Sequence, residues 1–284
     1  MHTIGLVLHP RRDSAEAVEA VLKWATAAGA EVLGVANEVQ RLNCAATAVS
    51  EAELGRRSDL LVSLGGDGTM LRAMRMSAGP RPPVLGVNVG KLGFLAEIDP
   101  PEMADALVAI DEQRFTTEAR SAVRAEFQDQ RHLAFNDVDL ARIPGLSSSA
   151  VVELTVEGHP FVRYAADALI VATPTGSTAY AFSAGGPIVS PMVEGLLVIP
   201  ASPHSAYNRA LFLNAAERLT LTVLPTSGEL AVEADGIVVG HVRPGDVIDL
   251  STVPDAAQVV RLGKTTFYQR AQRKLRLTGS AEAD

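Results

Sequence analysis

Leu60-Leu61-Val62-Ser63-Leu64-Gly65-Gly66-Asp67-Gly68-Thr69 is the stretch that decides the fold of this chain. Its first five residues are apolar apart from one serine, which predicts a short strand buried on both faces, as in a parallel sheet. The glycines that follow let the backbone take a positive φ and approach a ligand closely. We expect Thr69 to open the next helix, whose free N–H groups favour a phosphate. The stretch therefore predicts an α/β sheet that carries a phosphate-binding loop.

A single carboxylate, Asp67, stands inside this predicted anion-binding turn. A carboxylate there repels phosphate unless a metal ion, or a hydroxyl group to which it hydrogen-bonds, is also present. We therefore interpret Asp67 as catalytic. On the Gly-Gly-Asp-Gly sequence alone, the alternative that Asp67 only caps the helix stands beside this interpretation.

The composition excludes several classes of protein. The 284 residues are 47% hydrophobic and 20% charged, as in ordinary globular proteins, and their length favours two domains. A formal net charge of −8 argues against a general nucleic-acid binder, which needs a basic face. The single cysteine, Cys44, excludes an internal disulfide and suits a reducing compartment. We find neither a signal peptide nor an apolar run of roughly 20 residues, so we expect a cytoplasmic protein without a membrane span.

Strands and helices alternate around the glycine-rich stretch. The patterns predict strands at Thr3–Leu8, Glu31–Val35 and Val84–Asn88, and helices at Asp13–Gly29, opened by a capping box with Glu16, and at Pro101–Gln113. From Ser121 onward, apolar and polar residues alternate between Gly and Pro turns, which is typical of an antiparallel, β-rich, sandwich-like domain. We therefore predict an α/β domain over residues 1–115 and a β-rich domain over 116–254, with the tail from about 255 to 284 packing back on the first.

A second informative stretch is Thr173-Pro174-Thr175-Gly176-Ser177-Thr178-Ala179-Tyr180, which follows a predicted buried strand. Hydroxyl groups and small residues suit a surface that hydrogen-bonds ribose and amide groups, and the ring of Tyr180 could stack on a base. On composition alone, a turn rich in Ser and Thr is the favoured explanation.

Together the two stretches resemble the NAD kinase family in order and spacing. The resemblance rests on Gly65-Gly66-Asp67-Gly68-Thr69, Gly86-Val87-Asn88-Val89-Gly90-Lys91-Leu92-Gly93-Phe94-Leu95, Asn136-Asp137, Thr173 to Tyr180 and Ser183-Ala184-Gly185-Gly186-Pro187. Pro203-His204-Ser205 and Asp235-Gly236 resemble later motifs of that family. The resemblance covers about residues 60–240. A Walker A sequence is absent, and Leu71 stands where a dinucleotide fingerprint has a glycine.

The resemblance implies transfer of a phosphoryl group from ATP, or from polyphosphate, to the 2′-hydroxyl of the adenosine ribose of NAD, giving NADP. It assigns Asp67 as the catalytic residue, which accepts the hydroxyl proton or orients that hydroxyl. Gly65, Gly66, Gly68 and Thr69 would bind the ATP phosphates through backbone amides. A divalent metal ion, taken to be Mg²⁺, would bridge phosphate oxygens, and no side chain is assigned as its ligand.

The same resemblance places NAD in the β-rich domain. The NAD-binding residues that it implies are Asn136, Asp137, Asp167, Thr178, Ala179, Tyr180 and Ser183. Two positions depart from the family: Asp137 replaces a Glu, and Ala168 replaces a Gly. His204 and Asp235 are interpreted as structural or indirect contributors.

Two other functions compete with this one. A sensor that binds NAD or NADP without turnover would have lost Asp67, which is present, and a lipid kinase would need an apolar groove and a basic membrane-facing patch. We expect the partners to be NAD and ATP, with no nucleic acid and no membrane, and the protein to be a homo-oligomer, a dimer or a tetramer. The preference for NAD or NADH stays open.

Overall fold

The computed structural model describes residues 1–90, 93–204 and 206–277. Lys91, Leu92 and Ser205, which belong to motifs quoted above, lie outside the described residues. The chain divides into two compact units: residues 1–119 together with the segment from 256 onward, and residues 120–255. The boundary falls within two long strands, β6 (Thr116–Phe127) and β17 (Val247–Arg261).

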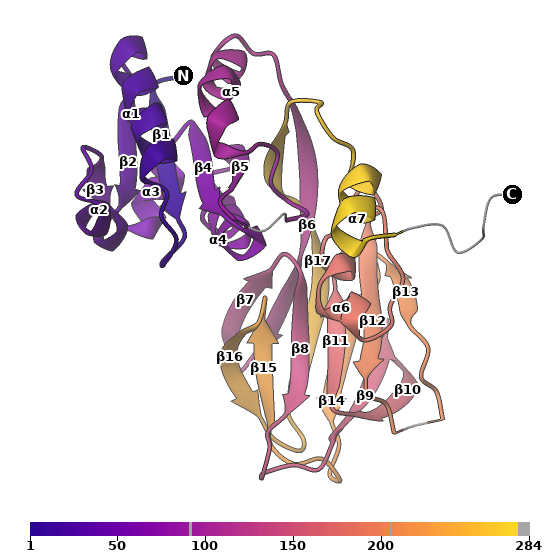
Figure 1. Ribbon diagram of the computed structural model, residues 1–284. Helices are drawn as coiled ribbons and strands as arrows, with labels where there is room; N and C mark the ends of the chain where they lie inside the picture. Colours follow the sequence, from indigo (N-terminus) through magenta and orange to yellow (C-terminus); the bar gives the residue numbers. More distant parts are fainter. Residues whose placement is uncertain (91–92, 205, 278–284) are drawn as a thin grey trace, which may run out of the picture. The chain divides into compact units, whose positions relative to one another are not determined.

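The first unit is built on a parallel sheet, which confirms the fold class predicted for the N-terminal part. Its strands follow the order β3-β2-β1-β4-β5, and Val259 of β17 pairs with Val84 in the same direction (Figure 1). The strands are β1 (Thr3–Leu8), β2 (Glu31–Val35), β3 (Thr47–Val49), β4 (Leu60–Gly65) and β5 (Val84–Asn88). Every residue of β4 is buried, because both faces of the sheet are covered.

The first unit also contains the helices of the described chain other than those near Tyr180, and several of them cover the faces of this sheet. They are α1 (Ala15–Ala28), α2 (Ala36–Leu42), α3 (Glu51–Arg57), α4 (Asp67–Ser77), the 3₁₀ turn η1 (Pro100–Glu102), α5 (Met103–Asp111) and α7 (Phe267–Leu275). Helices α1 and α5 share one hydrophobic core with Leu6, Val62 and Leu85. The opposite face meets α3 and α4, since Gly5 faces Leu54 of α3 and Gly86 faces Met70 of α4.

Two local predictions in this unit were wrong. The capping box of Asp13 and Glu16 does not form, because α1 begins at Ala15 and Asp13 accepts a hydrogen bond from the Ala15 N–H at 2.9 Å. The segment between β2 and β4 also contains α2, β3 and α3, which we did not predict. These elements are three to seven residues long, too short to give a clear hydrophobic period.

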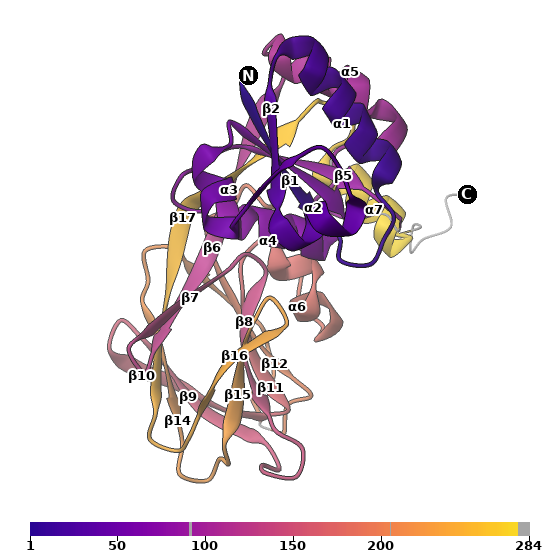
Figure 2. The same ribbon diagram turned by 90° about the vertical axis from the view of Figure 1, so that its left-hand side faces the viewer.

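The second unit is an antiparallel sandwich, which confirms the β-rich class. Its strands besides β6 and β17 are β7 (Gln130–Ala134), β8 (Asp137–Arg142), β9 (Ala150–Val156), β10 (His159–Ala166), β11 (Ala168–Ala172), β12 (Gly195–Ala201), β13 (Leu211–Asn214), β14 (Leu219–Val223), β15 (Leu230–Ala234) and β16 (Ile237–Val242). One sheet runs β13-β12-β11-β8-β15-β16 and the facing strands include β10-β9-β14-β17 (Figure 2). Val138, Leu154, Val171 and Leu221 belong to the core between them.

The outer face of the six-stranded sheet carries the residues of interest. Because strand residues alternate, Val138 and Leu140 point into the sandwich core while Asp137 and Asp139 point outward. The short helix α6 (Tyr180–Ser183) covers part of that outer face through Ala181, which packs with Ile170 and Ile199. Among the helices of the described residues, none has the length and apolar character needed to cross a membrane.

Candidate active site

The glycine-rich loop joins β4 to α4 at the carboxyl end of the parallel sheet. Strand β4 ends at Gly65, Gly66 is the N-cap, and Asp67 is the first residue of α4. Our prediction that Thr69 opens the helix was therefore wrong by two residues. Thr69 is buried within the first turn, where its side chain occupies the space a Cβ on Gly65 would need, 2.2 Å from its Oγ1. The N–H of Thr69 donates to the carbonyl of Gly66 at 3.1 Å, so the first-turn amides that suit an anion are those of Asp67 and Gly68.

The carboxylate of Asp67 is held by three donors from distant parts of the chain. The backbone N–H groups of Phe94 and Leu95 donate to it at 3.1 Å each, and the ammonium of Lys274 donates at 2.8 Å. Its side chain keeps 26% of its surface exposed. This geometry fixes the orientation of the carboxylate and leaves part of it accessible to a ligand.

Gly93 must be a glycine because Asp67 occupies the place of its side chain. A Cβ at this position would lie 2.2 Å from Oδ1 of Asp67, closer than any non-bonded contact allows. The motif Gly93-Phe94-Leu95 is thus the cradle of the carboxylate. The sequence showed the motif but not which residue it holds.

Arg12 is a second cation beside the loop, and the sequence gave no reason to single it out. Its guanidinium donates to the carbonyl of Val89, and its Nη1 would lie 3.8 Å from a Cβ on Gly66. His9 organises the turn that carries it, accepting N–H groups of Arg11 and Arg12 on Nδ1. Burial, with the charges of the neighbouring arginines, lowers the pKa of His9, so this imidazole stays neutral. His9 directly follows the last residue of β1, and its N–H donates to the carbonyl of Leu64 at 2.9 Å.

In the second unit, Asn136 and Asp137 lie where β8 begins. The carboxylate of Asp235 accepts the N–H groups of Phe135 at 3.3 Å and Asn136 at 2.7 Å, so it supports the backbone that presents Asn136. The amide of Thr173 donates to the Asn136 carbonyl at 2.8 Å. Asp235 thus has a structural part in this loop, in line with its interpretation from the sequence.

Asp137 is almost completely buried, with 4% of its surface exposed. Burial, followed by the nearby charges of Asp235 and Glu233, raises the pKa of its carboxyl group to about 7, while a hydrogen bond from the backbone of Tyr180 acts in the opposite direction. A side chain this deep has little surface to offer a ligand. It does contact the backbone of Tyr180, another residue of the predicted set.

Asp139 is a feature that the sequence analysis missed. It lies two residues along β8 from Asp137 on the same face, and directly opposite Glu233 of β15. It is 1% exposed, and burial, followed by the charges of Asp137 and Glu233, raises its pKa to about 9. A carboxyl group with that pKa is protonated at neutral pH. An apolar-polar alternation is easily read as surface, which is why this buried acid gave no signal.

Several residues of the Thr- and Ser-rich block face the interior of the protein. Thr173 and Ser177 are fully buried, and their hydroxyl groups donate to the backbone carbonyls of Phe135 and Pro174. Gly176 lies so close to Asn136 that a Cβ would stand 2.0 Å from its carbonyl oxygen. These residues therefore bind the block to the Asn136 loop, and the turn interpretation accounts for them.

The remaining residues of the predicted NAD set lie around α6 and β11. Thr178 and Ala179 precede α6, Tyr180 and Ser183 form its ends, and the Tyr180 side chain is 43% exposed. Burial and the charges of Asp139 and Glu233 raise the pKa of Tyr180, so it stays a neutral phenol.

Asp167 lies just before β11, near one arginine and one histidine. Nε of Arg142 donates to Asp167 at 2.6 Å, and Nε2 of His204 lies 4.0 Å away. The indirect role interpreted for His204 stays a prediction, and Arg142 was not predicted.

The predicted residues thus form two groups, one in each unit. Asp67 and the loop glycines belong to the first unit. The second holds Asn136, Asp137, Asp167, Thr178, Ala179, Tyr180 and Ser183.

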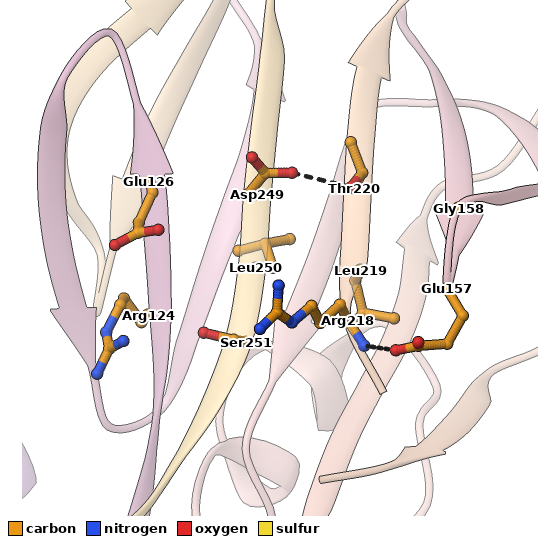
Figure 3. A pocket seen from close by; sticks show the side chains of 10 residues that line it. All are labelled: Arg124, Glu126, Glu157, Gly158, Arg218, Leu219, Thr220, Asp249, Leu250 and Ser251. Carbon is orange, nitrogen blue, oxygen red and sulfur yellow. Dashed lines mark hydrogen bonds between the residues drawn. The ribbon is translucent and has the colours of Figure 1, made fainter. Parts of the chain in front are cut away.

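A cavity of about 430 Å³ in the second unit contains none of these residues. Its lining is Arg124, Glu126, Glu157, Gly158, Arg218, Leu219, Thr220, Asp249, Leu250 and Ser251 (Figure 3). Two hydrogen bonds lie within its lining: the backbone N–H of Arg218 donates to Glu157 at 2.6 Å, and the Thr220 hydroxyl donates to Asp249 at 2.9 Å. We therefore do not assign this cavity to the reaction.

A glycine loop at a helix N-terminus, with a held carboxylate, defines a phosphotransferase that acts on a hydroxyl group. Comparison with known families gives two matches: residues 4–115 match the ATP-NAD kinase N-terminal domain, and residues 135–262 match the ATP-NAD kinase C-terminal domain. The chain belongs to the NAD kinase family. It is a kinase of the ATP-dependent type that phosphorylates NAD.

Individual relatives agree with this assignment. The chain is 35% identical to NAD kinase 1 of Streptomyces avermitilis, covering 99% of this chain and 88% of the relative. It is also 35% identical to the NAD kinase of Desulforamulus reducens, over 97% and 98% of the two chains. Among solved structures, yeast NADH kinase complexed with NADH has a TM-score of 0.84 at 27% identity, covering 100% of this chain and 89% of that one. An NAD kinase from Archaeoglobus fulgidus in complex with ATP has a TM-score of 0.75 at 25% identity, over 98% and 100%.

Proposed function

We propose that Asp67 is the catalytic residue of this NAD kinase and that it accepts, or orients, the proton of the 2′-hydroxyl of the adenosine ribose of NAD. The observation that carries the proposal is the carboxylate fixed by the amides of Phe94 and Leu95 at the N-terminus of α4. Phosphoryl transfer depends mainly on positioning and charge stabilisation, so one oriented carboxylate and a set of backbone donors suffice.

Gly65, Gly66, Gly68 and Thr69 form the proposed binding loop for the ATP phosphates. The first-turn amides of α4 and the positive end of the helix dipole favour these anions. Thr69 shapes this loop, because its side chain is buried against Gly65 and its N–H donates to the Gly66 carbonyl at 3.1 Å. Arg12 adds a positive charge beside Gly66.

A divalent metal ion, Mg²⁺, is proposed to accompany the ATP. The described parts of the chain contain no group of three or more His, Cys, Asp or Glu side chains placed to hold a metal ion. The donor set nevertheless fits Mg²⁺, which is commonly bound through substrate phosphates and one or two carboxylates. The ion would be held chiefly by donor phosphates, with Asp67 as the carboxylate whose charge it offsets. When bound, it would neutralise charge on the phosphate oxygens.

We propose that the chain has two functional domains, residues 1–115 and 116–254, and that the second domain binds NAD. Asn136, Asp167, Thr178, Ala179, Tyr180 and Ser183 are its proposed NAD contacts, with Asp137 acting beside them. Support comes from the shared hydrogen bonds of this group: Asn136 is tied to Thr173, and Asp137 to Tyr180.

The active form is proposed to be a cytoplasmic homo-oligomer built through the β-rich domain. Strand β16 is an edge of the six-stranded sheet and exposes the side chains of Ile237 and Val238, each more than half accessible. Open strand edges are sites of pairing with another chain. Sedimentation at working concentrations should show a dimer or tetramer, and a fully active monomer would refute this point.

The test of the function is NADP formation by the purified chain. NAD, ATP and Mg²⁺ are supplied together, then ATP is replaced by polyphosphate or NAD by NADH, and the product is measured with an NADP-specific dehydrogenase. ATP-dependent NADP formation supports the proposal. Phosphate release from ATP without NADP would point to another acceptor.

A further inference from the structure

Lys274 joins the C-terminal helix to the proposed catalytic carboxylate. Its Nζ lies 2.8 Å from Oδ2 of Asp67, 207 residues away in sequence, and 4.7 Å from the centre of the Phe94 ring. Phe94 is also the residue whose N–H donates to Asp67. The ammonium group therefore lies where the carboxylate and its cradle meet.

The position of Lys274 is fixed by a buried network one helical turn earlier. Arg270 precedes it by four residues, which places both side chains on the same face of α7. The Arg270 guanidinium donates to buried Glu97 at 3.3 Å and to the carbonyl of Thr265 at 2.9 Å. Arg261 reaches the same Glu97 oxygen at 3.1 Å. Glu97 lies two residues beyond Leu95. Residues 94–97 therefore bind both Asp67, through the N–H groups of Phe94 and Leu95, and α7, through Glu97.

A carboxylate in a phosphate-binding loop needs a compensating charge. Two charges of the same sign a few ångströms apart repel each other strongly at a protein surface. The protein itself supplies a cation at this point. A lysine ammonium carries three N–H donors, and Asp67 uses one of them.

We propose that Lys274 is a site residue with two tasks: it neutralises Asp67, and it donates its other N–H groups to the phosphates of the bound donor. This inference rests on the proposed role of Asp67. In the transfer, a bond forms between the ribose 2′-oxygen and the γ-phosphorus while the bond from that phosphorus to the β,γ-bridging oxygen breaks. The hydroxyl proton passes to Asp67 and then to solvent, and ADP leaves with the electron pair of the broken bond. Lys274 stabilises the phosphate oxygens during this exchange.

The test compares three variants of the full chain. Lys274→Met keeps the length of the stem without the charge, and Lys274→Arg restores a cation. Lys264→Met is the matched control, because Lys264 also belongs to the first unit and makes an exposed ion pair with Glu102. Each is measured for kcat, for the KM values of ATP and NAD, and for thermal unfolding.

For Lys274→Met we expect the KM for ATP to rise about tenfold or more and kcat to fall, as for a lost hydrogen bond to a charged group. The KM for NAD should stay within about twofold, and Lys274→Arg should recover most of the loss. Lys264→Met should resemble the wild type. Unchanged ATP constants in Lys274→Met, or ATP and NAD constants that rise together in step with a lower melting temperature, would show that Lys274 only ties α7 in place.

A binding measurement without turnover separates this inference from the proposed role of Asp67. Calorimetry with Mg-ATP is performed on Lys274→Met, Asp67→Asn and the double variant. If Lys274 offsets the carboxylate, the loss of ATP affinity caused by Lys274→Met should be several-fold smaller when Asp67 is already neutral. Equal losses in both backgrounds would overturn the neutralising role, whatever the turnover of Asp67→Asn.

Discussion

Arg142 and Asp167 form an ion pair in which Nε of the arginine lies 2.6 Å from Oδ1 of the aspartate. Both side chains are about a third exposed, so the pair faces solvent, at the end of β8 opposite to Asp137. Arg142 ends β8 and Asp167 directly precedes β11, its neighbour in the sheet. The arginine thus holds a carboxylate that the family resemblance assigns to the dinucleotide.

We predict that Arg142→Met raises the KM for NAD several-fold, because Asp167 loses the partner that orients it. An exposed pair contributes at most about 1 kcal/mol to folding, so the melting temperature should change little. Arg163→Met is the control: Arg163 makes an ion pair with Glu153 of the same length, 2.6 Å, in the same unit. If the two variants have the same KM for NAD, Arg142 does not orient Asp167 for NAD binding.

The second prediction concerns Asp137, where the chain departs from the family glutamate. Asp137→Ala should raise the KM for NAD several-fold, equivalent to about 1 kcal/mol for an ordinary hydrogen bond, with a smaller effect on kcat. Because Asp137 is deeply buried, its side chain could act only by holding the backbone of Tyr180 in place. In that case Asp137→Asn, which keeps an acceptor for the Tyr180 N–H, should restore the NAD constant. A variant with an unchanged NAD constant and only a lower melting temperature would exclude Asp137 as a ligand.

The third prediction is a fall in stability with rising pH. Asp137 and Asp139 have pKa values of about 7 and about 9 in the folded chain, against an ordinary value of 3.8 for an aspartate, so the folded state binds more protons than the unfolded chain between these values. Their contribution is complete below about pH 4 and is lost as the pH rises through the folded pKa values. Each excess proton lowers the unfolding free energy by about 1.4 kcal/mol per pH unit.

Asp139→Asn tests this directly, because its amide cannot ionise. Urea unfolding at pH 5, 7 and 9 should show that the unfolding free energy of the variant depends less on pH than that of the wild type. The difference should correspond to about one bound proton between pH 5 and 9. Asp249→Asn is the control, because the Asp249 side chain is exposed and its carboxylate accepts a hydrogen bond from Thr220. Its stability should depend on pH as that of the wild type does. If the slopes of wild type and Asp139→Asn coincide, Asp139 is not the buried acid that the structure describes.

The sequence was most informative where neighbouring residues determine the structure. The buried strand before Gly65, the glycine turn and the alternation after Ser121 all depend on residues close in sequence, so the fold class followed from them. The contact between Lys274 and Asp67 could not be predicted, because it is formed only in the tertiary structure, by residues 207 positions apart in the sequence. The contact between Arg142 and Asp167 could not be predicted for the same reason.

Side-chain direction was the other obstacle. A run of hydroxyl groups predicts polar contacts but not whether they face a ligand or the backbone. Thr173 and Ser177 turned inward, while Tyr180 stays exposed. Asp139 resembled a surface residue in an alternating strand, and only the burial of that face showed otherwise.

The central claim is that Asp67 performs the proton step, and Asp67→Asn tests it most directly. The variant should fold and bind NAD, while kcat falls at least about a hundredfold, as expected for a positioned base. Some loss of stability is expected because one N–H of Phe94 or Leu95 loses its acceptor. Ser77→Ala is the matched control: it lies on the same helix and removes a buried hydrogen bond, 2.6 Å to the carbonyl of Pro82, away from the loop. The account predicts a hundredfold lower kcat in Asp67→Asn and a normal kcat in Ser77→Ala at similar stability. Near-normal turnover in Asp67→Asn would contradict it and leave Asp67 as the group that fixes Phe94 and Leu95.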